Sequence, residues 1–109
     1  GMRISEPSLD LGIVTALVSS YQDRPVDDSL LVFGEVGLSG EVRAVSMAEQ
    51  RVAEAVKLGF ETCVLPQSNR AAMKKDYPVR LIGVRNVQEA MAVLEGNAGR
   101  KGGAADGKV

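Results

Sequence analysis

The stretch that most constrains the fold lies at residues 34–60, with the sequence GEVGLSGEVRAVSMAEQRVAEAVKLGF. It opens with three glycines at a spacing of three, Gly34, Gly37 and Gly40. Glycine tolerates positive φ, so this spacing favours a tight reversal of the chain. Residues with high β-propensity stand on both sides of the glycines. We therefore predict a strand, a turn and a second short strand.

A helix over residues 47–58 should follow this strand pair. Ser46 and Glu49 have the spacing of a capping box, in which each side chain binds a free backbone N–H at the start of a helix. Apolar residues then recur at helical spacing, and Gly59 is placed to end the helix in a left-handed conformation. The unit thus reads strand, turn, strand and helix.

Five further elements are expected in the rest of the chain. Alternation of apolar and polar residues, together with capping signals, places them as follows: a helix at 9–21, a strand at 62–65, a helix at 68–75 and a strand at 79–84. A last helix should begin near Asn86 and end at Gly96. The broad apolar face of the 9–21 helix predicts that it is largely buried against a sheet.

The alternation of helices and short apolar strands predicts an α/β fold, in which helices pack on one mixed sheet. We expect the run at 62–65 to be a buried parallel strand, with Cys63 as a core residue. The predicted domain covers residues 1–95. Residues 96–109 are rich in glycine and charge and lack an apolar anchor, so we expect a disordered tail.

Charge and size exclude several classes of protein. The chain has 109 residues, the length of one domain. No apolar run approaches the roughly 20 residues of a membrane span, so we expect a cytoplasmic protein without membrane contact. Thirteen basic residues stand against fourteen acidic ones, which is not the basic excess typical of nucleic-acid-binding proteins.

Residue types that build metal and cofactor sites are scarce. The sequence has one cysteine and no histidine, which excludes an internal disulfide and any histidine-based triad. Asp23, Asp27 and Asp28 cluster in a polar stretch but lack the glycine and distal glutamate of a calcium loop. A Walker-type phosphate loop is also missing. We therefore predict no metal site and no cofactor in this chain.

The strand pair and helix at 34–60 resemble the Lon-type serine/lysine peptidases. In that family a GE-x-x-L-x-G-x-V strand pair leads into a helix whose first turn supplies the catalytic lysine, and Glu49 stands at that position here. Aligned through the shared A-L-V-S at residues 16–19, Ser8 falls on the catalytic serine. A carboxylate with an ordinary pKa of about 4.3 is too weak a base to activate a serine hydroxyl. The resemblance thus implies a degenerate peptidase site at Ser8 and Glu49, with no catalytic residue.

A wider resemblance covers residues 3–94. The segments that carry it are ISEP at 4–7, DL at 10–11, DRP at 23–25 and GEVGLSGEVR at 34–43. Together they are similar to the C-terminal Lon-protease-like domain of the bacterial RadA (Sms) family of DNA repair ATPases. The implied fold is the Lon-protease-like, or ribosomal-protein-like, α/β fold, here without its N-terminal strands. We expect a truncated domain rather than a whole enzyme.

The resemblance also implies a function. In the RadA family this domain lacks peptidase activity, serves as a scaffold for a hexameric ring and contributes to binding duplex or branched DNA. ATP and zinc would belong to other domains of a longer, DNA-dependent ATPase. Our DNA-binding candidates are Arg43, Arg51 and Lys57. The alternative interpretation is that all three are ordinary exposed charges.

Two alternative functions stay open. The chain could be a stand-alone binding module of the same fold. It could also be a residual serine peptidase with Ser8 as nucleophile and a base from elsewhere in the fold, although a serine early in a helix more often binds free backbone N–H groups.

Overall fold

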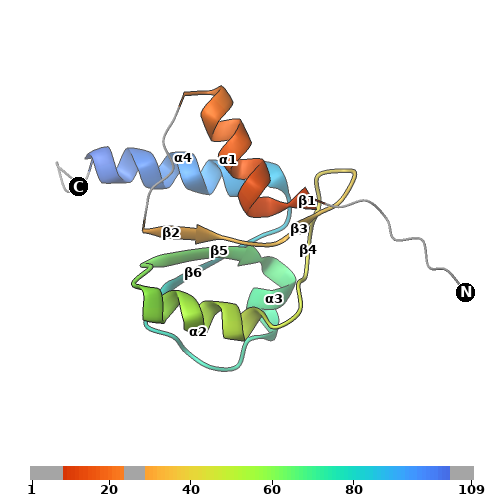
Figure 1. Cartoon of the computed structure of the whole chain (residues 1–109), viewed down its shortest axis with the longest axis vertical. Helices are drawn as coiled ribbons and strands as arrows, with labels where there is room; N and C mark the ends of the chain where they lie inside the picture. Colours follow the sequence, from red (N-terminus) through yellow and green to blue (C-terminus); the bar gives the residue numbers. More distant parts are fainter. Residues whose placement is uncertain (1–8, 24–28, 104–109) are drawn as a thin grey trace, which may run out of the picture.

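The computed structural model of the chain describes residues 9–23 and 29–103, with side chains up to residue 96 (Figure 1). The elements are β1 (Leu9–Asp10), α1 (Leu11–Tyr21), β2 (Leu30–Val32), β3 (Glu35–Val36), β4 (Val42–Arg43), α2 (Ala48–Leu58), β5 (Thr62–Pro66), α3 (Gln67–Ala72), β6 (Arg80–Val84) and α4 (Val87–Gly103). The alternation of helices and strands is the predicted one, except that β1 was not predicted and three strands, β2, β3 and β4, stand where a strand pair was expected. Ser8 lies outside the described residues, as do Asp27 and Asp28.

The strands form two sheets rather than the single mixed sheet that we predicted. β2, β5 and β6 make a parallel sheet with β5 in the centre, while β1, β3 and β4 make an antiparallel one with β3 in the centre. The chain leaves one sheet and enters the other at Phe33 and Gly34. The Phe33 N–H donates to the Val64 carbonyl at 3.0 Å, and the Gly34 carbonyl accepts from the Leu11 N–H at 2.9 Å. Parallel and antiparallel pairings are therefore present but separated in space.

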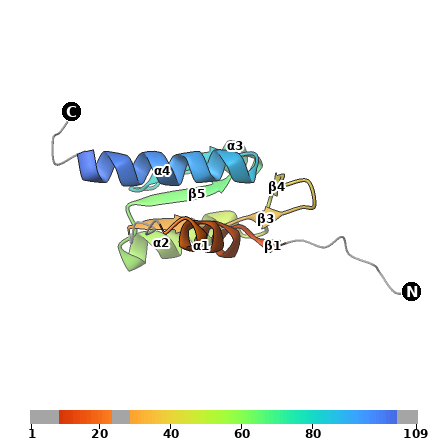
Figure 2. The ribbon, with the colours of Figure 1, turned by 90° about the horizontal axis from the view of Figure 1, so that it is seen from above.

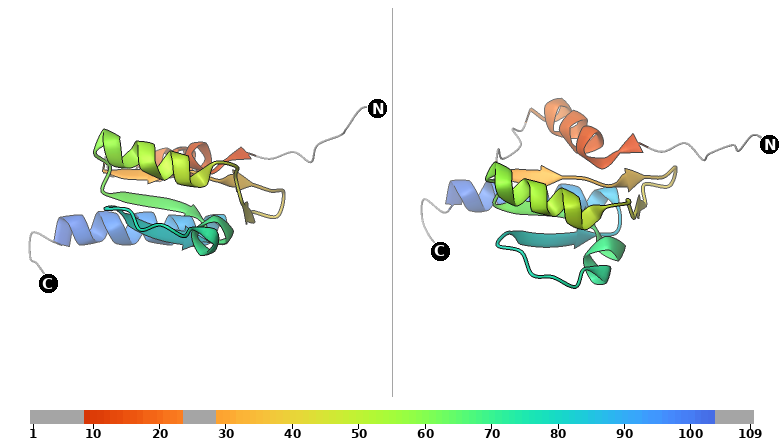
Figure 3. Two further views of the ribbon diagram at one scale, coloured as in Figure 1. Left: turned by 90° about the horizontal axis from the view of Figure 1, so that it is seen from below. Right: turned by 60° about the horizontal axis from the view of Figure 1, so that its bottom comes forward.

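Helices α2 and α4 cover opposite faces of the parallel sheet (Figures 2 and 3). Two apolar cores result. The α4-side core contains Leu11, Leu30, Val36, Val64, Val84, Ala90 and Leu94. The α2-side core contains Phe33, Ala48, Val52, Ala55, Cys63 and Leu65. All five residues of β5 are buried, which confirms the buried parallel strand and the core position of Cys63.

Helix α1 begins two residues later than predicted. Leu9 and Asp10 pair with β3 instead, and the Asp10 carboxylate caps the helix by accepting from the Ile13 N–H at 3.1 Å. Extended backbone before an aspartate N-cap is a common way to start a helix. Because Asp10 already caps the N-terminus, the helix starts at Leu11.

The broad buried face that we predicted for α1 is wrong. The buried residues of the helix are Leu11, Thr15 and Ser19, whereas Ile13 is 60% exposed and Leu17 65% exposed. The helix lies beside β2, the edge strand of the parallel sheet, and contacts α4 (Figure 1). At a sheet edge only one side of a helix finds a neighbour, so the opposite side faces outward.

The last two helices also differ from the predictions. α3 is shorter than predicted, and none of its residues is buried. α4 does not end at Gly96 as predicted but continues to Gly103. Asn86 does cap α4, accepting from the Glu89 N–H at 2.8 Å. No described helix is both long enough and apolar enough to cross a membrane.

Candidate functional site

The first turn of α2 carries Glu49, the residue predicted from the sequence to stand at the position of a peptidase lysine. The predicted capping box does not form: the N-cap is Met47, whose side chain makes no capping hydrogen bond and whose backbone is left-handed at φ 60°. Gly59 ends the helix at φ 91°, as predicted. The helix therefore starts without help from Ser46 or Glu49, which leaves the Glu49 carboxylate available for another partner.

That partner is Tyr77, which lies between α3 and β6. The Tyr77 hydroxyl donates to Glu49 Oε1 at 2.8 Å. This hydrogen bond raises the pKa of Tyr77, with smaller contributions from desolvation and from the negative charge of Glu49. A carboxylate at this position cannot take the part of the neutral amine in a serine/lysine pair.

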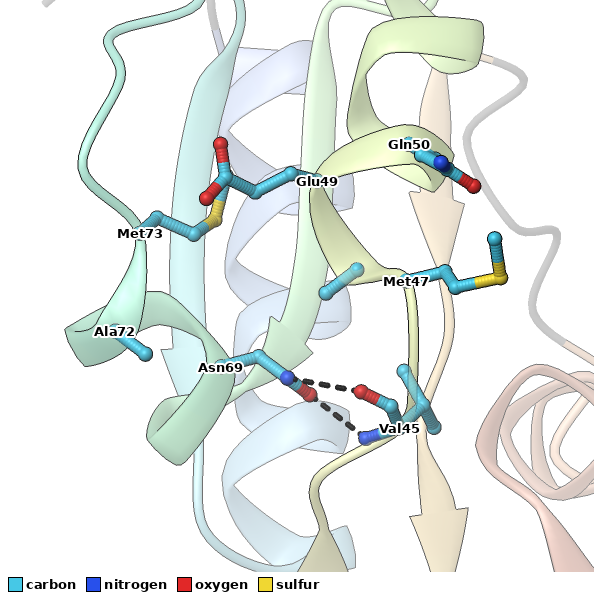
Figure 4. A pocket seen from close by; sticks show the side chains of 8 residues that line it. Val45, Met47, Glu49, Gln50, Asn69, Ala72 and Met73 are labelled. Atoms are coloured by element: carbon cyan, nitrogen blue, oxygen red, sulfur yellow. Dashed lines mark hydrogen bonds between the residues drawn. The ribbon is translucent and has the colours of Figure 1, made fainter.

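A cavity of about 310 Å³ lies between α2 and α3 (Figure 4). Its lining is Val45, Met47, Ala48, Glu49, Gln50, Asn69, Ala72 and Met73. Figure 4 shows the Glu49 carboxylate beside Met73. Two thioethers and one carboxylate make a mostly apolar cavity with a single negative edge.

Asn69 fixes the loop that enters α2. Its Oδ1 accepts from the Val45 N–H at 2.9 Å, and its Nδ2 donates to the Val45 carbonyl at 3.0 Å. The side-chain amide thus satisfies both backbone groups of one residue, as a neighbouring strand would. Sequence reasoning missed Asn69 and Tyr77, because neither lies in a local motif and both meet their partners across more than twenty residues of chain.

The residues next to Ser8 lie elsewhere. Leu9 and Asp10 pair with β3 and do not line the cavity at Glu49. Asp10 instead borders a second cavity of about 340 Å³ beside β2 and α2, whose other lining residues are Leu31, Val32, Phe33, Arg51, Glu54, Ala55, Leu58 and Phe60. In the described part of the chain, Asp10 and Glu49 thus border different cavities.

The three predicted DNA-binding residues have different surroundings. Arg43 forms an ion pair with Glu41 at 2.8 Å, and this hydrogen bond is the largest cause of the lowered pKa of Glu41. The Arg51 guanidinium lies 5.6 Å from the centre of the Phe33 ring, within the range of a cation–π contact. Lys57 is exposed in the last turn of α2.

These residues do not form one patch by helix geometry. Arg51 and Lys57 are six residues apart on α2, which at about 100° per residue separates them by about 120° around the axis. Arg43 lies on β4 and is already paired. A role in DNA binding remains a prediction for all three.

Metal ligands do not gather in the described part of the molecule. Across residues 9–23 and 29–96, no group of three or more histidine, cysteine, aspartate or glutamate side chains could hold an ion. Cys63 is buried, and desolvation raises the pKa of its thiol, which disfavours the reactive thiolate.

Comparison with known proteins places the chain among two sets of relatives. The family model described as subunit ChlI of Mg-chelatase matches residues 1–69. The DNA repair protein RadA of Bacillus subtilis (strain 168) is 46% identical over 91 residues, which are 84% of this chain and 20% of the relative. RadA of Escherichia coli (strain K12) is 39% identical over 95 residues, 87% of this chain and 20% of the relative. The chain therefore spans about a fifth of the length of these relatives.

Proposed function

Because the chain belongs to the family described as subunit ChlI of Mg-chelatase and is 39–46% identical to RadA proteins, we propose that it is a non-catalytic domain of a DNA repair protein. The observation that carries the proposal is the similarity to RadA over 84–87% of the chain. In this role the domain has the Lon-protease-like fold, helps a longer cytoplasmic ATPase to assemble as a hexameric ring, and binds duplex or branched DNA.

The surroundings of Glu49 support a role without peptidase chemistry. A serine/lysine pair needs a neutral amine beside the serine hydroxyl. Here the corresponding position holds a carboxylate that accepts from Tyr77. Leu9 and Asp10, which follow Ser8 in the sequence, do not line the cavity at Glu49.

A gain-of-function experiment tests this part of the proposal. Glu49→Lys restores the residue type of the peptidase family. We expect this variant and the wild type to show no labelling of Ser8 by a fluorophosphonate probe, with Ser8→Ala as the background control. Labelling of Ser8 in Glu49→Lys above that background would contradict the assignment, because it would mean that position 49 reaches the serine.

For DNA binding, exposure favours Arg51 and Lys57 over Arg43. Arg43 forms an ion pair with Glu41, and the negative charge of Glu41 reduces the attraction of Arg43 for phosphate. Arg51 and Lys57 are exposed, and no described carboxylate forms an ion pair with either within 4.0 Å. We therefore expect these two residues to contribute more to phosphate binding.

The test is fluorescence anisotropy of a labelled duplex, titrated with the chain at several salt concentrations. Arg51→Gln and Lys57→Gln should weaken binding for every DNA sequence and reduce the slope of log K against log salt by about 1 each. Lys75→Gln is the matched control, since it removes one exposed positive charge outside β4 and α2. An equal effect of all three variants, or no binding by the wild type, would contradict DNA contact at this site.

A further inference from the structure

The cavity between α2 and α3 has one acidic side chain and no basic one among its described lining residues. Glu49 is the acidic residue, and Figure 4 shows its carboxylate beside the Met73 thioether, with the Gln50 side chain pointing away from both. Across residues 9–23 and 29–96, no lysine or arginine forms an ion pair with Glu49 within 4.0 Å. The cavity therefore carries a negative charge that the described chain does not balance.

The Glu49 carboxylate is held in place through one of its two oxygens. Oε1 accepts from the Tyr77 hydroxyl at 2.8 Å, whereas Oε2 has no hydrogen-bond donor among the described residues. An ionised carboxylate has lone pairs for about four donors, so Oε2 can still accept from a ligand. The start of α2 adds a partial positive charge of about half an elementary charge, which is smaller than the full negative charge of Glu49. This edge of the cavity thus favours a cation over an anion.

The rest of the lining sets the size and polarity of the ligand. Ala48, Ala72 and Met73 supply apolar surface. The Asn69 amide is already hydrogen bonded to the Val45 backbone on both sides. A volume of about 310 Å³ is at the lower end of the range of ligand pockets, which suits one side chain rather than a large ligand. A fitting ligand combines a short apolar stem with a positively charged end.

We propose that this cavity binds the side chain of a lysine from another protein. The four-carbon stem lies along Ala72 and Met73, as lysine stems commonly lie along apolar surface, and the ammonium group donates to Glu49 Oε2. Arginine fits less well, because its planar guanidinium pairs best with both carboxylate oxygens, and Tyr77 already occupies Oε1. Met47 and Ala72 are exposed, so the cavity opens to the surface and the partner's backbone stays outside it. The inference does not rest on the proposed function.

Methyl NMR of the chain, with ¹³C-labelled methionine methyl groups, tests the site. The probe is lysine capped as the N-acetyl N′-methylamide. We expect it to shift the methyl signal of Met73 in a saturable way and to leave unchanged that of Met91, which packs against the α4-side core. The capped norleucine has a similar stem without the charge and should bind at least about ten-fold more weakly, because it loses a hydrogen bond to a charged group. Equal binding of the two probes, or equal shifts of both methionines, would overturn the proposal.

Two variants test the part played by the carboxylate. Glu49→Gln removes the charge but keeps an oxygen that can accept from Tyr77, so the fold should be retained. It should raise the dissociation constant of the capped lysine at least about ten-fold. Glu54→Gln is the matched control, since Glu54 is exposed on the same helix and borders the other cavity; it should leave the constant within about two-fold of wild type. Equal weakening by both variants would contradict binding at Glu49.

Two further titrations identify the source of the amine. n-Butylamine should bind more weakly than the capped lysine, because it has no peptide groups to contact the exposed rim. Equal affinity would assign the cavity to free amines and overturn its assignment to a protein side chain. Dilution of the chain alone should leave the Met73 signal unchanged. A shift on dilution would mean that a lysine of a second copy fills the cavity, which would also overturn the proposal.

Discussion

Helices α1 and α2 have the same length, eleven residues, but they differ in which kinds of side chain they bury and expose. α2 buries Ala48, Val52 and Ala55 and carries four charged side chains. α1 carries no charged side chain, and two of its three buried residues, Thr15 and Ser19, are polar. Its large apolar residues Ile13 and Leu17 point outward instead.

The difference shows which helix is fully packed within the described chain. α2 has the ordinary amphipathic pattern, is joined to Tyr77 through Glu49, and follows a loop fixed by Asn69. Among the described residues, α1 contacts the rest of the chain along one side only. The predictions below test this contrast, from the largest expected effect to the smallest.

The two sides of α1 should differ most in their effect on stability. Leu11 is fully buried in the α4-side core, so Leu11→Ala should lower the free energy of unfolding by about 2–5 kcal/mol. Leu17→Ala should change it by less than about 0.5 kcal/mol. Urea denaturation at low protein concentration measures both without a contribution from association. A similar loss in both variants would mean that Leu17 is packed within a single chain, and the contrast between the helices would fail.

The loop that enters α2 should depend on Asn69. Asn69→Ala removes two hydrogen bonds to the Val45 backbone and should cost about 1–3 kcal/mol in the free energy of unfolding. Ser68→Ala, at an exposed neighbouring position, is the control and should cost less than about 0.5 kcal/mol. Equal losses in denaturant titrations would show that the Asn69 amide does not hold this loop.

The start of α2 contains a residue under backbone strain. Met47 adopts φ 60°, a left-handed conformation that suits asparagine better than methionine, and its side chain is 62% exposed. Met47→Asn should therefore raise the free energy of unfolding by up to about 1 kcal/mol. Thermal unfolding measures the gain, and Ser46→Asn should give none. Destabilisation by Met47→Asn would indicate that the methionine side chain matters more than the backbone.

Because Tyr77 donates a hydrogen bond to Glu49, the free energy of unfolding should depend on pH in the alkaline range. The pKa of Tyr77 is raised above 10.0 in the folded state by its hydrogen bond to Glu49. The folded chain thus holds this proton more tightly than the unfolded chain, so the contribution is complete below pH 10.0 and is lost as the pH rises through the raised pKa. Denaturation between pH 7 and pH 11 should show this loss in wild type and in Tyr21→Phe, but not in Tyr77→Phe. A loss that persists in Tyr77→Phe would assign it to other groups.

Local sequence patterns predicted the helices and strands better than the tertiary contacts that these elements make. The apolar run before Pro66 gave β5, and helical spacing with Gly59 gave α2, because both signals reside in neighbouring residues. The capping box does not form because the N-cap is Met47 rather than Ser46. Glu49 instead accepts from Tyr77, 28 residues away, and no local pattern encodes that contact. The apolar spacing of α1 was also correctly read as a helix. Its orientation was not predictable, because it depends on α4 and on which strand forms the sheet edge.

The alternation of side chains along β5 makes the two cores depend on each other. Val64 belongs to the α4-side core, while Cys63 and Leu65 belong to the α2-side core. Neither core can open fully without disturbing the strand that both share, so the parallel sheet and its two covering helices should unfold as one cooperative unit. During synthesis, the chain cannot close either face of that sheet until β6 has been made, since β6 pairs with β5 along all five of its residues.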